Sequence, residues 1–451
     1  MKIALVHCKI NYDNMEPFGI LLLGTILKNE GHDVLILDIF PGDSSLYLNQ
    51  LQKFHPEIIG YSIETPAYKR ISDINNKIKK LLPNAKRCAG GVHPTAMPEQ
   101  TLRDLLLDFV LFGEADISFP QVVERIKNGQ DYSKLPGLAY LKNNKFIKNS
   151  PAPVLNNLDE LPILDRSLIS YQKFYLSAPG NIRGLFNDRC SEMMTSRGCP
   201  FDCTFCGSNV IFGKKIRRRS VNHVIKEINY LQETFDVKTI YFVDDTFTIQ
   251  PSWVKEFCER LICDKIKLKW CCQSRADTLK PGLLKLMKIS GCVQIDVGVE
   301  SGSPKVLQAL RKGETVEMLE TAVNNIKRAG LRALCSFVIG APEETDDDIQ
   351  KTISFIKRTK PSMSQYFTLS PYPGSPLWDQ ALSNGWLDNV SFDDSWSLKS
   401  SSTSHMQINF TPEELIQKRA EMEKLTAFQD NFYYLIGWFR YPKYLVKLIK
   451  A

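Results

Sequence analysis

The stretch SRGCPFDCTFCGS, residues 196–208, places three cysteines on one short segment, in a CxxxCxxC pattern. Three thiolates so spaced suit an iron–sulfur cubane whose fourth iron stays free for another ligand. A zinc site usually takes four ligands, as two CxxC pairs or a CxxC with a histidine pair, and no such pair follows nearby. We therefore interpret Cys199, Cys203 and Cys206 as cluster ligands, with a zinc site and a chance cluster as the alternatives.

The composition narrows the class of protein. The chain has 451 residues, enough for two or three domains, and its formal net charge of +7 argues only weakly for nucleic acid. The first residues, MKIALVH, form a short apolar run that soon meets charged residues, so neither a signal peptide nor a membrane span is expected. Twelve cysteines without an export signal indicate a reducing, cytoplasmic location, where clustered thiols bind metal or do chemistry.

Strand and helix patterns alternate on both sides of the cysteine loop. Downstream, strand-like runs lie at 192–197, 238–244, 267–274, 293–300, 332–340 and 363–370. Six such βα units predict a partial (β/α)6 barrel of the TIM type at 189–380, with its active site at the carboxyl ends of the strands. Upstream, residues 1–135 predict a doubly wound, Rossmann-like parallel sheet. Residues 136–188 are predicted to be a linker, and 381–451 a loop and helical tail.

The cysteine loop resembles that of the radical S-adenosylmethionine superfamily. CPFDCTFC matches the family's CxxxCx-aromatic-C loop after the first barrel strand, with Phe205 at the aromatic position. The resemblance implies that three thiolates hold a 4Fe-4S cluster whose free iron binds the amino and carboxylate groups of S-adenosylmethionine. An electron from the cluster then cleaves the sulfonium and yields a 5′-deoxyadenosyl radical.

Polar strand ends extend the resemblance along the barrel. YFVDDTFT places Asp244 and Asp245 where the family has polar groups near the methionine amine, and a carboxylate there pairs with an ammonium. QIDVGVESGSP ends on Glu300, which resembles the family residue near the ribose. For each acid taken alone, a strand-end cap or salt bridge is the alternative.

Three further positions are expected at the S-adenosylmethionine site. WCCQSRADTL places Ser274 and Arg275 after the third strand, and Arg275 is suited to hold a carboxylate in a bidentate fork. CSFVIGAPEET matches the family's fifth strand, where Gly340 admits adenine close to the backbone. SPYPGSPLW matches a sixth strand end. No catalytic acid or base is nominated.

Residues 1–135 resemble the cobalamin-binding domain that precedes many of these barrels. Gly19 closes the first loop, NMEPFG (14–19), and four further positions are expected to meet the corrin or its nucleotide tail, namely Ser62, Thr65, Gly90 and Gly91. Asn14 and Glu16 stand where the familiar Asp-x-His pair would be, so the histidine ligand to cobalt is missing. Barrel-linked members often bind cobalamin without it, and His93 is interpreted as structural. A Rossmann-like domain that has lost its ligand is the alternative.

Three remaining features have blander interpretations. The other cysteines of the barrel lack the spacing of cluster ligands, and we interpret them as small apolar residues of helices and strands. GKKIRRRS (213–220) is interpreted as a solvated loop, with a docking patch for an acidic flavodoxin- or ferredoxin-type electron donor as the alternative. The aromatic and basic tail is interpreted as a helix packed on the domain. A peripheral membrane helix at 430–451 that helps a lipid-like substrate enter is the alternative.

The resemblance implies an enzyme that uses a 4Fe-4S cluster, S-adenosylmethionine and cobalamin on a small-molecule or lipid-like substrate. Methylation of an unactivated carbon is the reaction that we expect first. A redox reaction like that of the anaerobic porphyrin cyclases, or one on an isoprenoid, is the first alternative. Methylthiotransferases share the barrel but carry extra N-terminal cysteines, whereas only Cys8 and Cys88 precede residue 190 here. A cobalamin or iron–sulfur sensor is the non-enzyme alternative.

Overall fold

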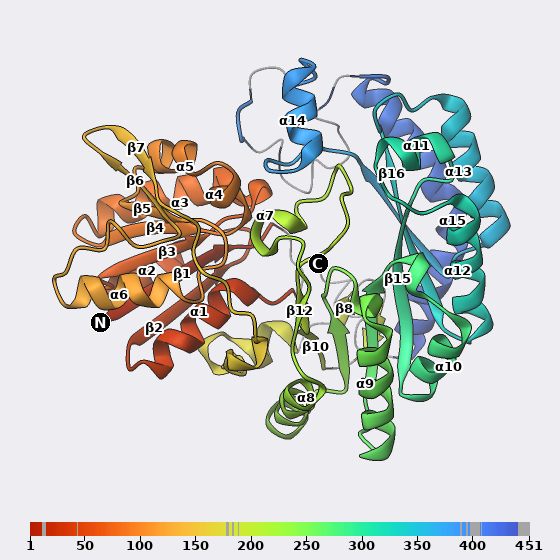
Figure 1. Cartoon of the computed structure of the whole chain (residues 1–451), viewed down its shortest axis with the longest axis horizontal. Helices are drawn as coiled ribbons and strands as arrows, with labels where there is room; N and C mark the ends of the chain where they lie inside the picture. The colour runs from red at the N-terminus through yellow and green to blue at the C-terminus, as the bar shows by residue number, and fades with distance from the viewer. Residues whose placement is uncertain are drawn as a thin grey trace.

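Two α/β domains stand side by side in the computed structural model (Figure 1). The structure describes residues 1–10, 15–42, 44–176, 180–182, 185–187, 189–387, 390–393, 396, 406 and 408–440. The N-terminal domain lies on the left and the barrel on the right, and the short helix α7 (Ser208–Phe212), which follows the cysteine loop, lies between them. The cysteine loop therefore sits next to the boundary between the two domains.

The N-terminal domain is built on a seven-stranded sheet of order β2-β1-β3-β4-β5-β6-β7. Its first five strands are parallel: β1 (Lys2–Cys8), β2 (Asp33–Ile39), β3 (Ile58–Ser62), β4 (Lys86–Gly90) and β5 (Phe109–Leu111). Helices cover both faces, and each face buries its own apolar cluster. The predicted doubly wound sheet is confirmed. Its helices are α1 (Phe18–Asn29), α2 (Ser45–Phe54), α3 (Tyr68–Leu81), α4 (Val92–Ala96), α5 (Pro98–Leu105) and α6 (Ser118–Lys127).

The sheet continues past the boundary predicted at residue 135. Strands β6 (Leu138–Lys142) and β7 (Lys145–Lys148) form an antiparallel hairpin that pairs with β5. Asn143 and Asn144 turn this hairpin with φ values of 50° and 61°. Two left-handed residues match the right-handed twist of the flanking strands, and asparagine tolerates that conformation better than most residues. The segment that links the domains thus begins only after Lys148.

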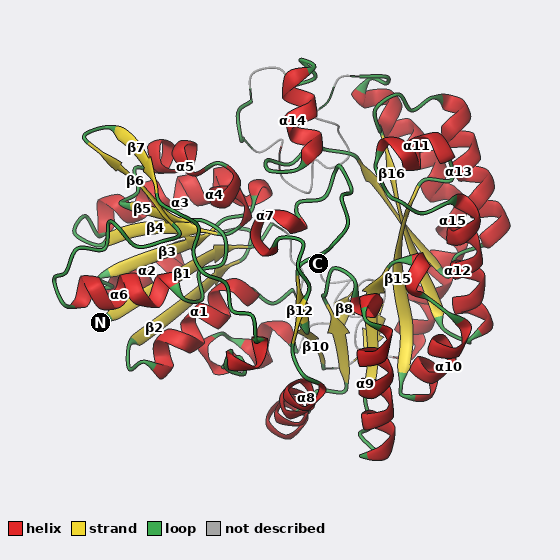
Figure 2. Ribbon diagram, viewed as in Figure 1, coloured by secondary structure: helices red, strands yellow, loops and turns green. Residues whose placement is uncertain are grey.

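The second domain is an open six-stranded parallel barrel of order β10-β13-β14-β15-β16-β17. Figure 2 shows these strands as a curved wall with helices on its outer side. The strands are β10 (Cys190–Met193), β13 (Thr239–Phe242), β14 (Lys269–Ser274), β15 (Cys292–Glu300), β16 (Arg332–Ile339) and β17 (Met363–Thr368). Five coincide with predicted runs, and β10 begins and ends earlier than the run predicted at 192–197, so the partial barrel is confirmed. Smaller antiparallel pairs are β8 (Gly180–Ile182) with β9 (Leu185–Asn187), and β11 (Ser196–Arg197) with β12 (Arg217–Arg218).

Helices and strands of the barrel bury the largest apolar cluster of the described chain between them. Local signals fix the helix ends: Thr315 caps α12 through the N–H of Met318, and Thr345 with Asp348 forms a capping box at the start of α13. The helices are α8 (Val221–Phe235), α9 (Pro251–Cys263), α10 (Pro281–Ile289), α11 (Pro304–Ala309), α12 (Val316–Arg328), α13 (Asp346–Thr359) and α14 (Pro376–Ser383).

The last helix, α15 (Pro412–Arg440), runs along strand β17. The side chain of Asp430 accepts a hydrogen bond from the backbone N–H of Ser364 at 3.1 Å, and the hydroxyls of Tyr366 and Thr426 lie 3.2 Å apart. Packing of the tail on the domain is therefore observed as far as Asp430. Residues 441–451 lie outside the described residues. Among the described helices, none combines the length and apolar character that a membrane crossing requires.

Candidate functional site

The cysteine loop is fixed by backbone contacts within itself and with the residues that follow α7. The N–H of Cys199 donates to the carbonyl of Gly213 at 3.2 Å, and that of Cys206 donates to the carbonyl of Cys203 at 3.2 Å. Gly198 has a φ of 91°, and a Cβ there would lie 2.3 Å from the carbonyl oxygen of Lys215. Only glycine fits this close approach of backbone to backbone. The glycine directly before Cys199 therefore determines the backbone conformation at the start of the loop.

The three predicted ligands are free thiols, and each is partly exposed. In the part of the chain that the structure describes, no group of three His, Cys, Asp or Glu side chains converges as the ligands of a single metal ion would. A cubane requires a different arrangement, because its three thiolates bind three separate irons. The reduced, accessible thiols of Cys199, Cys203 and Cys206 fit that requirement.

Phe205 secures the loop to the barrel. Its partly buried ring packs on an apolar cluster that includes Val306, Leu310 and Val338. The preceding residue, Thr204, donates its N–H to the carbonyl of Leu310 at 2.9 Å. The position predicted for cofactor contact therefore anchors the loop on α11 and β16.

The two aspartates after β13 have different surroundings. Both carboxylate oxygens of Asp244 accept from the N–H of Thr195, and one also accepts from the hydroxyls of Thr195 and Ser196. These bonds favour a structural role for Asp244, whose contact with the methionine amine stays a prediction. Asp245 instead accepts from Ser208 at 2.8 Å, and the Ser208 hydroxyl lies 3.2 Å from the sulfur of Cys206. Asp245 is thus linked through Ser208 to the end of the loop that carries Cys206, whereas Asp244 bonds its beginning.

Arg275 lies directly over the cysteine loop. Its guanidinium carbon is 3.6 Å from the ring centroid of Phe201, which stands between the first two cysteines. Its Nη2 is 3.2 Å from Asp277 and 3.5 Å from Glu314, while its buried Nε has no hydrogen-bond partner in the structure. A buried guanidinium with an unused N–H is suited to a further anionic acceptor. The geometry thus leaves one N–H of Arg275 for an acceptor, and the carboxylate fork stays a prediction.

Glu300 belongs to a buried charge network that the sequence analysis did not identify. Its carboxylate lies 3.1 Å from the ammonium of Lys312, which is also 3.6 Å from Glu314. Glu300 follows a register shift in β15 and has a φ of 65°. A Cβ at Gly298 would lie 2.3 Å from the Glu300 carboxylate, so glycine leaves the space into which that side chain folds. A non-glycine residue held in a left-handed conformation marks stored strain, which is common at functional sites.

Ser274 and Gly340 lie at the predicted strand ends, and their contacts with S-adenosylmethionine stay predictions. The Ser274 hydroxyl is buried against the hydroxyls of Thr248 and Thr278. Gly340 has a φ of 86°, but a Cβ there would lie 3.3 Å from Leu415 on α15. The side of Gly340 that a side chain would occupy therefore faces the tail helix rather than open space for adenine.

A large cavity lies between the N-terminal sheet and the cysteine loop. It contains about 1210 Å³ of space free of protein atoms, its open mouth included. Four of the five residues predicted to meet cobalamin line it, namely Gly19, Ser62, Gly90 and Gly91. Its inner wall is apolar, with Leu5 and Phe119, and its far wall includes Phe212 of α7. Glycines on the rim and an apolar interior fit a flat aromatic tail group.

Thr65 does not line this cavity. Its hydroxyl lies 3.0 Å from Nδ1 of His93, whose ring is fully buried and packs against Tyr68 and Phe392. Burial lowers the pKa of His93 to about 3. A neutral, enclosed imidazole fits the predicted structural role of His93, and it explains why Thr65 points away from the cavity.

The run GKKIRRRS is only partly solvated, because Lys214 and Lys215 are exposed whereas Arg217 and Arg219 are buried. Arg217 pairs with Glu114 of the N-terminal domain, and Arg219 pairs with Glu227 at 2.5 Å. Ion pairing across the domain boundary offsets the cost of removing these charges from water. The expected solvated loop is therefore wrong for the arginines, and docking of an electron donor stays a prediction that only the exposed lysines of this run could serve.

Glu16, at the usual histidine position, is likewise buried. Its carboxylate accepts from Arg166 Nε at 2.7 Å, from the hydroxyl of Ser191 at 2.9 Å and from the N–H of Glu192 at 3.0 Å. Asn14, at the neighbouring position, lies outside the described residues. Glu16 thus ties the first loop of the N-terminal domain to the first barrel strand.

Family models match both domains: residues 193–356 match the radical SAM superfamily, and residues 11–123 match the B12 binding domain. The chain is 34% identical to an uncharacterized methyltransferase, PH0819, of Pyrococcus horikoshii, over 82% of this chain and 79% of that protein. It is 27% identical to the anaerobic magnesium-protoporphyrin IX monomethyl ester cyclase of Rubrivivax gelatinosus, over 81% of this chain and 66% of the cyclase.

Among solved structures, the fold is similar to the radical S-adenosylmethionine methyltransferase TsrM of Kitasatospora setae, solved with cobalamin and a [4Fe-4S] cluster bound. The TM-score is 0.71 at 16% identity, over 92% of this chain and 84% of TsrM, so this likeness concerns the fold alone. The order of the domains, the cysteine loop and the extensive match to PH0819 agree: the chain belongs to the radical SAM superfamily, among the members whose barrel follows a B12-binding domain.

Proposed function

We propose that this protein transfers a methyl group to an unactivated carbon of a small-molecule substrate. Membership of the family implies a 4Fe-4S cluster, S-adenosylmethionine and cobalamin as cofactors. When bound, they supply a hydrogen-abstracting 5′-deoxyadenosyl radical and a methyl carrier. The observation that carries the proposal is the cavity whose two walls come from the predicted cobalamin glycines and from α7, directly after the cysteine loop.

We assign the roles of this chain's residues as follows. Cys199, Cys203 and Cys206 hold the cluster, and Arg275, stacked on Phe201 with an unused N–H, receives a carboxylate beside it. The carboxylate of Glu300, which Lys312 holds in place, accepts hydrogen bonds from the ribose hydroxyls of S-adenosylmethionine. The barrel walls position the substrate and exclude water, since a carbon radical would otherwise be quenched. An electron donor of flavodoxin or ferredoxin type is required to reduce the cluster.

Relatives of the chain include both a methyltransferase and a cyclase, and one experiment separates the two reactions. The reconstituted protein is incubated anaerobically with substrate, a reductant and S-adenosylmethionine labelled in its methyl group. Methyl transfer predicts that S-adenosylhomocysteine and 5′-deoxyadenosine appear together, and that label reaches the product. Deoxyadenosine without S-adenosylhomocysteine would reject methyl transfer in favour of a redox reaction like that of the cyclases.

A further inference from the structure

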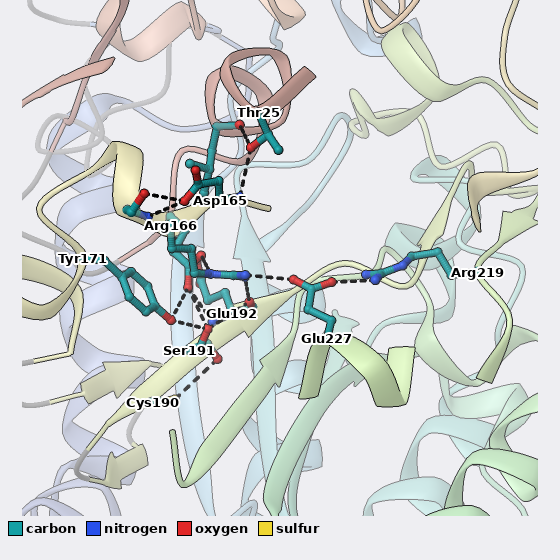
Figure 3. Close-up of polar contacts among 12 residues, drawn as sticks. Thr25, Asp165, Arg166, Tyr171, Cys190, Ser191, Glu192, Arg219 and Glu227 are labelled. Carbon is teal, nitrogen blue, oxygen red and sulfur yellow. Dashed lines mark hydrogen bonds and ion pairs between the residues drawn. The ribbon is translucent and has the colours of Figure 1, made fainter. Parts of the chain in front are cut away.

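The segment between the domains is bound to both of them. Asp165 donates its N–H to the hydroxyl of Thr25 at 3.0 Å and pairs with Lys28 at 2.6 Å, which fixes it to helix α1. The next residue, Arg166, points the other way, into the barrel (Figure 3). A flexible tether would leave such side chains in solvent, whereas Arg166 is fully buried.

The guanidinium of Arg166 donates hydrogen bonds to three separate partners. Its Nε donates to Glu16 at 2.7 Å, its Nη1 to Glu227 at 2.9 Å and its Nη2 to the backbone carbonyl of Glu192 at 3.0 Å. Glu16 belongs to the cobalamin domain, Glu192 to strand β10, and Glu227 to helix α8. One side chain of the linker therefore joins a loop of one domain to a strand and a helix of the other.

The carboxylate of Glu16 also accepts hydrogen bonds from residues of the linker and of the first barrel strand. Beside Arg166 it accepts from the hydroxyl of Ser191, from the N–H of Glu192 and from the hydroxyl of Tyr171 at 3.3 Å. In return, the N–H of Glu16 donates to the carboxylate of Glu192 at 2.7 Å. Moving the first loop of the cobalamin domain away from β10 would break this whole set at once.

Glu227 connects the network to the cavity, which it lines together with Arg219. Burial alone would raise the pKa of Glu227, but Arg219 and Arg166 outweigh burial and lower this pKa to about 2. Glu227 is therefore an anion held between two arginines (Figure 3). Removing one member of such a buried set leaves charges without compensation.

We propose that Arg166 is a positioning residue that locks the cobalamin domain onto the barrel in one orientation. On the proposed function, that orientation is the one in which bound cobalamin would face the barrel. Separating the domains would break the buried pair of Glu16 with Arg166, whereas the pair of Arg166 with Glu227 joins the linker to the barrel alone. The exposed Lys28–Asp165 pair cannot serve as such a lock, because solvent screens it.

Two variants and one matched control test the lock. Glu16→Gln keeps an accepting oxygen but places an amide donor or a neutral oxygen against Arg166. Arg166→Met combined with Glu16→Gln removes both charges, so it guards against simple misfolding from an unpaired buried ion. Lys28→Gln removes the exposed pair on the same linker and is the control. All three are compared with the full-length wild-type chain.

The first measurement is the distance between spin labels carried by azidophenylalanine at the exposed positions Leu106 and Ile289, one in each domain. The wild type and Lys28→Gln are expected to give one narrow distance, unchanged by added cobalamin or S-adenosylmethionine. The two lock variants are expected to give a broadened distribution. Their affinity for hydroxocobalamin should fall at least tenfold, because the far wall of the cavity is no longer held in place.

Neither readout requires turnover, so a failure of the proposed methyl transfer leaves this test intact. A second distance population in the wild type upon addition of S-adenosylmethionine would overturn the lock. So would wild-type distances and cobalamin affinity in the folded double variant, since the domains would then hold together without Arg166.

Discussion

The ammonium nitrogen of Lys312 lies 3.1 Å from the carboxylate of Glu300, across the bulge that holds Glu300 in a left-handed conformation. Burial disfavours the charged form of Lys312, but Glu300 and Glu314 raise its pKa above the usual range, so the side chain stays a cation. Without that cation, two buried carboxylates would face each other beside the cysteine loop, and Glu300 would lose the contact that fixes its direction.

Lys312→Met is therefore expected to weaken the binding of S-adenosylmethionine about tenfold, equivalent to about 1.4 kcal/mol. Titration of the cluster-loaded protein by calorimetry measures the effect. Lys305→Met is the matched control, because the exposed Lys305 bonds only the carbonyl of Glu343. Equal affinities in the two variants would remove Glu300 and Lys312 from the binding site.

Replacement of Cys199, Cys203 or Cys206 by Ala should each abolish the brown absorbance and the formation of deoxyadenosine after anaerobic reconstitution. Cys271→Ala and Cys272→Ala should retain both. These two thiols are fully buried, and burial raises their pKa well above the usual range, which keeps them protonated and unfit as ligands. Loss of the absorbance in either buried variant would demand a second cluster.

Glu344 is predicted to make the stability of the fold depend on pH. Burial, aided by Asp348, raises the pKa of Glu344 to about 7, although the N–H groups of Gly340 and Ala341 and the nearby Lys418 oppose the rise. The folded chain therefore holds this proton more tightly than the unfolded chain. That contribution, about 3 kcal/mol, is complete below pH about 4.5 and is lost as the pH rises through about 7.

Glu344→Gln should consequently raise the free energy of unfolding at pH 8 by about 1–3 kcal/mol. An amide oxygen can keep the bond from the N–H of Gly340, at 2.6 Å, without bearing a charge. Urea unfolding at pH 5 and pH 8 measures the change. A variant with the wild-type pH dependence would show that Glu344 ionises freely.

The sequence predicted the elements whose signals are local. Barrel strands, the cysteine loop and the cavity glycines each follow from short patterns, and all lie where expected. The buried ion pairs do not follow from local patterns, because their partners are far apart in the sequence. Glu114 and Arg197 are 83 positions apart, and Glu16 and Arg166 are 150 positions apart. From the sequence alone, a charged run after a strand is predicted to face solvent, because the domain that buries it is not visible in the local pattern. For the same reason the sequence did not indicate that Thr195 and Ser196 would hydrogen-bond to the carboxylate of Asp244.

Truncation after Arg440 tests the predicted membrane contact of the tail. Helix α15 is bonded to strand β17 as far as Asp430, so removal of 441–451 leaves those contacts in place. Residues 441–451, YPKYLVKLIKA, combine lysines with aromatic and aliphatic residues, which is typical of an interfacial helix. The full chain should co-sediment with anionic liposomes and the truncated chain should do so less. Equal sedimentation would end the idea that the tail delivers a lipid-like substrate.

The cobalt(II) form of bound cobalamin should show no splitting from an axial nitrogen of the protein in its paramagnetic resonance spectrum. Glu16 stands where the ligating histidine would be, and its carboxylate is committed to Arg166, Ser191 and Glu192. His93 cannot replace it, because the ring is fully buried between Tyr68 and Phe392. His93→Ala should therefore alter stability but leave the cobalt spectrum unchanged. If a nitrogen splitting appeared and vanished in His93→Ala, the histidine would have to leave its buried site to reach the metal. The cobalamin domain would then differ from the structure described above.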